Sequence, residues 1–221
     1  MGPPRVLKWI VVAMVVMGDA GGCSCLYAAT VRIYGGPFNL RIPANLGDTQ
    51  GWMNDAIVDV PDHITIADVD VRINITHTNV FDLQLYLVDS TNTTALLNMY
   101  NVDEFFKGAN YTGTIFDDEA DTPIEQGQAP FTGRFRPREP DRLARFDGHD
   151  AFGIWRLRIY DFWPNDAGSL DSFEIIITTP EPGTATLMIL GVGLLRLCNP
   201  RRMSNRPRKA HRKHKSLFTG G

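Results

Sequence analysis

Apolar and polar residues alternate along several short stretches of this 221-residue chain, with the two-residue period of half-buried β-strands. The clearest alternation lies in residues 64–75, 81–88, 154–160 and 172–178. Sequences rich in Asp, Asn, Gly and Pro separate these stretches and are typical of turns, at residues 89–92, 147–150 and 164–168. Because no stretch has the period of a long amphipathic helix, the pattern predicts an all-β domain.

We expect residues 34–178 to form one jelly-roll-like β-sandwich, since about 145 residues can bury enough apolar surface for a single core. The apolar positions of residues 64–75 change phase at Ala67-Asp68, which suggests a β-bulge. Trp155 alternates with Arg156 and is expected in the core. Trp163 lies in a turn and is the better candidate for an exposed contact, for example with a sugar ring.

The N-terminal residues 1–29 have the features of a secretory signal peptide. Arg5 and Lys8 precede a short apolar segment, and small residues follow it. The apolar segment is too short to span a bilayer comfortably, which disfavours an uncleaved anchor. A lipoprotein site with Cys23 as the acylated residue is a second interpretation of the same segment.

The C-terminal residues 179–221 combine Pro180-Glu181-Pro182, an apolar run over residues 186–195 and a basic tail. The run is shorter than the ~20 residues of a spanning helix, and the basic tail favours retention on the cytoplasmic side. The three features together resemble a bacterial PEP-CTERM sorting signal. This resemblance implies transient membrane anchoring, cleavage near Pro180-Glu181-Pro182 by an exosortase-type enzyme, and delivery to the cell surface or the extracellular matrix. An ordinary tail anchor after a Pro-rich linker is the alternative.

Charge is distributed unevenly along the chain. The net charge is −3, but many of the Lys and Arg residues lie in the two ends, so the central domain is strongly acidic. An acidic domain repels phosphate backbones, and we therefore expect no nucleic-acid partner. The three cysteines also lie in the ends, so the exported domain needs its core or a bound metal for stability rather than disulfides.

The order of motifs in the central region carries a second resemblance. The motifs are Ile73-Asn74-Ile75-Thr76-His77-Thr78, Asp82-Leu83, Phe116-Asp117-Asp118-Glu119-Ala120, Ala129-Pro130-Phe131, Gly153-Ile154-Trp155 and Asp166-Ala167-Gly168. This region, about residues 42–178, resembles the P (homo B) domain that follows the catalytic domain in kexin- and furin-like subtilases. Residues 89–93 depart from the family's usual Ser-Pro-Ser-Gly-Thr turn. We expect Asn92 to supply the positive φ that Gly normally provides there.

Consecutive acids at the end of an expected strand suggest a metal site. Asp117, Asp118 and Glu119 repel one another unless a cation or strong hydrogen bonds offset the repulsion, and their hard oxygen atoms suit Ca²⁺. Asp82 is the expected distant fourth ligand. The alternative is that these acids are solvated turn residues that cap backbone amides.

The resemblance suggests an association with proteolysis, but we expect no catalytic residues in this chain. It has no room for a subtilase catalytic domain, and His77 is interpreted as a histidine that orders a turn through backbone hydrogen bonds. The favoured function is a non-catalytic binding or structural module of the cell surface, with a matrix polysaccharide as one partner class. An accessory domain for a separately encoded subtilisin-like endopeptidase is the alternative, and an independent hydrolase is a third hypothesis.

Overall fold

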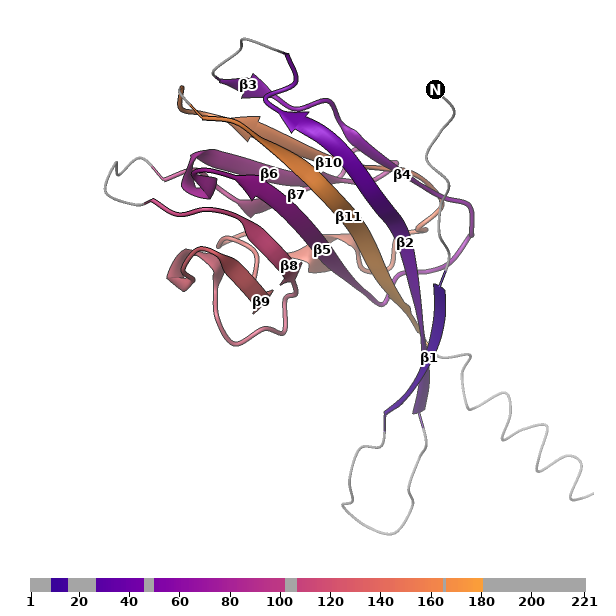
Figure 1. Ribbon diagram of the computed structural model, residues 1–221. Helices are drawn as coiled ribbons and strands as arrows, with labels where there is room; N and C mark the ends of the chain where they lie inside the picture. The colour runs from indigo at the N-terminus through magenta and orange to yellow at the C-terminus, as the bar shows by residue number, and fades with distance from the viewer. Residues whose placement is uncertain (1–8, 16–26, 46–49, 102–106, 165, 181–221) are drawn as a thin grey trace, which may run out of the picture. The chain divides into compact units, whose positions relative to one another are not determined.

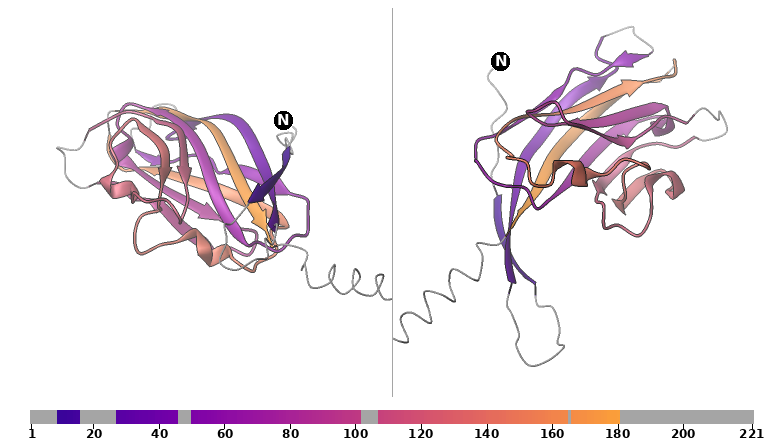
Figure 2. Two further views of the ribbon diagram at one scale, coloured as in Figure 1. Left: turned by 90° about the horizontal axis from the view of Figure 1, so that it is seen from below. Right: turned by 180° about the vertical axis from the view of Figure 1, so that it is seen from behind.

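The computed structural model describes residues 9–15, 27–45, 50–101, 107–164 and 166–180, with only the backbone of residues 9–15 and 27–28. Two β-sheets pack face to face, and Figures 1 and 2 show one layer in front of the other. The first sheet has the order β1 (Trp9–Val15), β2 (Tyr27–Ile42), β11 (Gly168–Thr179), β5 (Asp68–His77), β8 (Tyr111–Phe116) and β9 (Phe131–Phe135). The expected all-β sandwich is confirmed.

The second sheet is smaller. It has the order β3 (Gly51–Trp52), β10 (Gly153–Asp161), β6 (Leu83–Val88) and β7 (Thr94–Asn98), with β4 (Ala56–Val60) also paired to β10. All strand pairs in the two sheets are antiparallel except β8 with β9. Three short 3₁₀ helices join the strands: η1 (Val80–Asp82), η2 (Ile124–Gln126) and η3 (Leu143–Phe146).

Alternation along β5 and β10 places one row of side chains from each strand in the core. On β5 the inner row runs from Val69 to His77, and on β10 it runs from Trp155 to Asp161. Most of each row is apolar, but both rows end in a polar residue, and both of those polar side chains are buried. The two sheets therefore enclose an apolar core that is closed at one end by His77 and Asp161.

The phase change at Ala67-Asp68 has a different cause from the predicted bulge. The chain bends at Ala67, and strand β5 begins only at Asp68. Before the bend, Ile66 donates its amide to the carbonyl of His149, and Ala151 donates to the carbonyl of Ile64. Residues 64–66 thus pair with the loop before β10, so the change of phase marks a change of partner.

Several strands contain glycine and therefore lack the clear apolar–polar alternation that predicts a strand. Strand β2 contains Gly35-Gly36-Pro37, and β8 and β9 each contain a glycine, so these segments have the composition of turns. Gly35 has a φ of 127° and pairs with Glu174 of β11. A Cβ atom at Gly35 would overlap the carbonyl oxygen of Phe173. Only glycine therefore lets β2 and β11 approach each other here.

The predicted terminal segments lie largely outside the described residues. Backbone pairing joins Trp9–Val15, within the predicted signal peptide, to residues 27–33 of β2. Cys23, Glu181 and Pro182 are not among the described residues, and Pro180 ends the described chain. Within the described ranges, no helix has the length and apolar character needed to cross a bilayer.

Trp155 lies in the core, as predicted. Its side chain is fully buried, its ring packs 5.0 Å from that of Phe146, and its indole Nε1 donates to the carbonyl of Ala151 at 2.8 Å. By contrast, Trp163 is 38 % exposed, which also agrees with its predicted place in a turn.

Replacing Trp155 with alanine should lower the free energy of unfolding by about 3–5 kcal/mol, because it removes a large buried ring and leaves a cavity. Phe152, which is 45 % exposed, is the matched control, and Phe152→Ala should cost no more than about 1 kcal/mol. Urea unfolding followed by fluorescence and circular dichroism measures both. Equal losses for the two variants would contradict the packing described.

Candidate functional site

Charged residues gather at both ends of strand β5. Asp68 and Asp70 lie near its first end, beside the chain that follows β8, and His77 lies at its last residue. We call these two places the Arg134 cluster and the His77 cluster. The Arg134 cluster comprises Asp70, Asp117, Glu119 and Arg134, and the His77 cluster comprises His77, Asp82, Asp161 and Asp166.

An arginine neutralises the Arg134 cluster. The guanidinium of Arg134, on β9, donates to the carboxylates of Asp70 (3.0 Å) and Asp117. The other oxygen of Asp117 accepts the backbone amide of Glu119 at 2.8 Å. A side chain from a neighbouring strand thus supplies positive charge beside Asp70 and Asp117.

Asp118 points away from this pair. Its two carboxylate oxygens accept the backbone amides of Leu143 and Ala144, at 3.0 and 2.8 Å, at the first turn of η3. This contact satisfies two amides that would otherwise have no partner within the short helix. Asp118 therefore has the geometry of the capping residue that the sequence analysis kept as its alternative.

The structure does not bring Asp82 together with the other three acids. Asp82 accepts a hydrogen bond from Asn79 Nδ2 at 2.7 Å, close to His77, whereas Asp117 follows the residue that pairs with Val71. Six residues of extended strand separate those positions, a distance of about 20 Å. One ion cannot be shared across it. Calcium bound by Asp117, Asp118 and Glu119 stays a prediction.

The His77 cluster contains two residues that the sequence analysis did not select, Asp161 and Asp166. Nε2 of His77 lies 3.3 Å from Oδ2 of Asp161, and both side chains have no exposed surface. Nδ1 of His77 lies 3.0 Å from the carbonyl oxygen of Asn79, which confirms that this histidine orders a turn through the backbone. Burial, with the nearby carboxylates of Asp166 and Asp161, raises the pKa of Asp82 to about 7.

The sequence contains a signal for two members of this cluster. Asp161 continues the inner row of β10, and His77 continues the inner row of β5. Extending the two-residue period to the last residue of each strand would have placed both polar groups in the core. Asp166 comes from the loop before β11 and gives no comparable signal, since only the folded loop brings it near His77.

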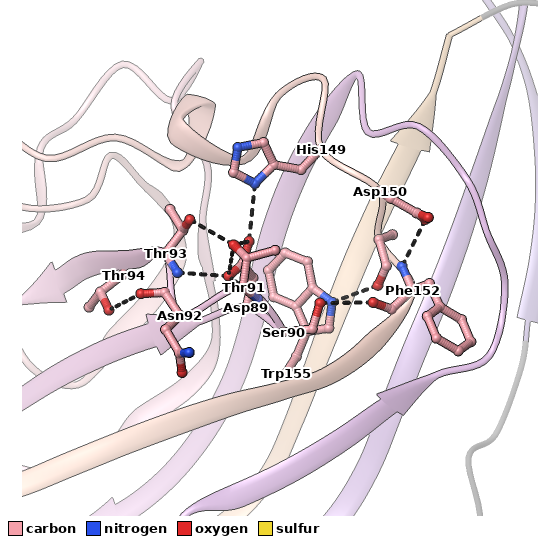
Figure 3. Close-up of polar contacts among 11 residues, drawn as sticks. Asp89, Ser90, Thr91, Asn92, Thr93, Thr94, His149, Asp150, Phe152 and Trp155 are labelled. Atoms are coloured by element: carbon pink, nitrogen blue, oxygen red, sulfur yellow. Dashed lines mark hydrogen bonds and ion pairs between the residues drawn. The ribbon is translucent and has the colours of Figure 1, made fainter.

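A second histidine–aspartate pair joins the turn between β6 and β7 to the loop before β10 (Figure 3). One oxygen of Asp89 accepts the backbone amides of Thr91 and Thr93, and the other lies 3.1 Å from Nδ1 of His149. The hydroxyl of Thr91 donates to the Asp89 carboxylate. Asn92 has a φ of 68°, as predicted for the position that glycine normally takes. These contacts stabilise a turn and do not align a hydroxyl nucleophile with the histidine.

Aromatic rings form a connected group on the outer side of the second sheet, which we call the aromatic face: Trp52, Tyr86, Tyr100, Tyr160 and Phe162, with Arg158. The ring of Trp52 lies 4.9 Å from that of Tyr160, and Phe162 stacks on Tyr100 at 3.6 Å. The guanidinium carbon of Arg158 lies 4.5 Å from the Trp52 ring. Trp52 nevertheless remains 44 % exposed.

Comparison with known families assigns this sandwich. A model of the proprotein convertase P-domain matches residues 66–177, which include strands β5 to β10 and most of β11. The chain belongs to the proprotein convertase P-domain family. The predicted P-domain resemblance is confirmed over this range. P-domains are accessory to the catalytic domain of subtilisin-like proteases, so the match is to a non-catalytic part.

Two solved structures are similar to this chain. One is the serine protease of Aeromonas sobria, with 15% identity and a TM-score of 0.36, covering 80% of this chain and 28% of that chain. The other is the Aeromonas sobria serine protease in complex with its chaperone, with 14% identity and a TM-score of 0.37, covering 82% of this chain and 28% of that chain. This chain thus spans less than a third of those chains. No curated protein matches it.

Asp118→Ala should lower the free energy of unfolding by about 1 kcal/mol, because two amides of η3 lose their acceptor. Asp121→Ala, an exposed acid of the same loop, should have almost no effect. Thermal melts in calcium and in EGTA test the role directly. A capping role predicts the same loss in both, and a loss confined to calcium would instead favour the predicted metal site.

Burial in the Arg134 cluster also predicts a pH dependence. Burial, followed by the charges of Asp117 and Asp68, raises the pKa of Asp70 to about 7. The folded protein therefore keeps a proton that the unfolded chain releases between about pH 4 and 7, and stability falls as pH rises through this range.

Asp70→Asn should remove the part of this fall in stability that comes from deprotonation of Asp70. At pH 8 the variant should be more stable than the parent protein by on the order of 1–3 kcal/mol, and near pH 4 the difference should vanish. Denaturant unfolding in EDTA at pH 4 to 8 measures it. A variant that is less stable at pH 8 would mean that the ion pair with Arg134 outweighs the cost of burying the charge.

Proposed function

We propose that this protein is an exported, non-catalytic P-domain module that binds a partner at the cell surface or in the extracellular matrix. Binding takes place on the aromatic face. The export part of the proposal is supported by the signal-like residues 1–29, and the sorting part by Pro180-Glu181-Pro182 with the apolar and basic residues that follow. An exosortase-type enzyme would process that segment.

The aromatic face is the observation that carries the binding role. Trp, Tyr and Arg supply most of the binding energy in protein interfaces, and flat rings also stack on sugars. Trp52 packs against Tyr160 and Arg158 while almost half of its surface faces solvent. Because these neighbours already hold the Trp52 ring, binding of a partner costs little conformational entropy of this side chain.

A matrix-binding assay tests this proposal. The purified protein is incubated with the extracellular polysaccharide and matrix of the producing cells, and the bound fraction is measured after sedimentation. The double variant Trp52→Ala/Tyr160→Ala should bind about tenfold more weakly or worse, the loss typical of a central aromatic contact. Phe152→Ala removes an exposed ring elsewhere and should bind as the parent protein does.

Binding that is equal for all three proteins would contradict the assignment to the aromatic face. Circular dichroism and melting temperature of the double variant serve as the control for folding. Both substituted rings lie on the outer side of the sheet, so the core contacts of β10 remain in place.

Family membership favours a second candidate, an accessory domain for a separately encoded subtilisin-like endopeptidase. In that case the aromatic face would contact a catalytic domain instead of the matrix. The test is co-expression with a lone subtilase catalytic domain encoded in the same genome. A rise in the soluble, active yield of the protease that is lost in Trp52→Ala/Tyr160→Ala would favour this candidate, and an unchanged yield would exclude it for that protease.

A further inference from the structure

Four polar side chains from four separate segments meet at the closed end of the core. His77 ends β5, Asp82 ends η1, Asp161 ends β10, and Asp166 lies in the loop that leads into β11. Ligand atoms of His77, Asp161 and Asp166 all lie within 4.8 Å of one another. The carboxyl of Asp82 neighbours those of Asp161 and Asp166. The cluster is thus built by the fold and is not a run of acids in one loop.

Two carboxylate oxygens of this cluster lack hydrogen-bond donors among the described residues. Asp161 has no exposed surface, yet its Oδ1 has no hydrogen-bond partner among the described residues, and Oδ1 of Asp166 is likewise buried without one. No Lys or Arg of the described part of the chain forms an ion pair with Asp82, Asp161 or Asp166. Buried carboxylates without donors are unfavourable unless a cation or a proton is bound between them. In the Arg134 cluster a guanidinium supplies the positive charge, although Oδ1 of Asp70 is also buried without a hydrogen-bond partner.

His77 is oriented as metal-binding histidines are. A ligating histidine commonly donates its second ring N–H to a backbone carbonyl, which fixes the ring and leaves the other nitrogen free to bind. Nδ1 of His77 lies 3.0 Å from the carbonyl oxygen of Asn79. Nδ1 also lies 3.2 Å from the backbone amide of Asn79, which donates to it, and Nε2 lies 3.3 Å from Oδ2 of Asp161. In the tautomer with the proton on Nδ1, Nε2 is free to bind a cation shared with Asp161.

A glycine allows close packing of the loop that carries Asp166, between β10 and β11. A Cβ atom at Gly168 would overlap the carbonyl oxygen of Thr76 and the ring of His77, so this position requires glycine. The amide of Phe162 donates to the carbonyl of Asp82 at 3.0 Å and joins the start of the same loop to η1. Both ends of the loop that carries Asp166 are therefore held against the residues of the cluster.

We propose that Asp82, Asp161, Asp166 and His77 bind one divalent metal ion. Three carboxylates and one imidazole form a mixed oxygen and nitrogen donor set, which suits Mn²⁺ or Zn²⁺ better than Ca²⁺, an ion that takes oxygen ligands. The ion joins the ends of β5 and β10 to the loop before β11 and so links the two sheets. This proposal does not rest on the binding function of the aromatic face.

Calorimetric titration and thermal melts of the purified protein, first freed of metal with EDTA, test the site. Mn²⁺ should bind with one ion per chain and raise the melting temperature. Asp166→Asn should weaken Mn²⁺ binding about tenfold or more, as the loss of a ligand or of its support does. Asp171→Asn is the matched control, because Asp171 accepts only the hydroxyls of Thr76 and Ser169 nearby, and it should bind Mn²⁺ as the parent protein does.

Without metal, the melting temperatures of the parent protein and the variant should differ in the opposite direction. Asp166→Asn removes a charge from a repelling group, so without metal this variant should melt at a higher temperature than the parent protein. Absence of Mn²⁺ and Zn²⁺ binding in the parent protein, or binding that is equal in Asp166→Asn, would overturn the site and assign the cluster to a shared proton. Tighter binding of Ca²⁺ than of Mn²⁺ and Zn²⁺, unchanged in His77→Gln, would overturn the role of His77 as a ligand.

Discussion

Strand β5 holds most of the described structure together through its inner row of side chains. It lies between β11 and β8 in the first sheet, and its apolar residues from Val69 to Ile75 face the second sheet. Because a strand must alternate, the same geometry that buries this row also directs its last member, His77, into the core. The fold thus has to accommodate a histidine at one end of its apolar interior.

Two charged clusters at the two ends of β5 illustrate different solutions to the same electrostatic problem. Near Asp70, the carboxylates face Arg134, a side chain contributed by β9. Near His77, no Lys or Arg of the described residues forms an ion pair with Asp161 or Asp166, and one oxygen of each is buried without a hydrogen-bond partner. Burying a charge without compensation is unfavourable in either place, so the second cluster is where a bound ion has the most to stabilise.

The aromatic face and the His77 cluster are neighbours in sequence and in structure. Phe162, which stacks on Tyr100, directly follows Asp161, and Tyr160 directly precedes it. Alternation along β10 turns Tyr160 outward and Asp161 inward. One strand end therefore supplies both an exposed ring for binding and a buried carboxylate. An ion that fixed the loop after β10 would also fix the rings beside it.

The sequence alone determined the all-β class, the buried place of Trp155 and the positive φ of Asn92, because two-residue alternation and turn chemistry are local properties. The P-domain family followed from the resemblance of the ordered motifs to that family. The sequence did not reveal strands such as β2 and β9. Their glycines allow close approach to neighbouring strands, and only the folded sheet brings those strands together. The sequence predicted one metal site from the consecutive acids Asp117, Asp118 and Glu119 with Asp82 as a distant ligand. Tertiary structure separated Asp82 from Asp117 by the length of β5, paired Asp117 with Arg134, and placed Asp82 with His77, Asp161 and Asp166. The physical reason is that a charged group's partner depends on distance in space, and the pairing of distant strands sets that distance.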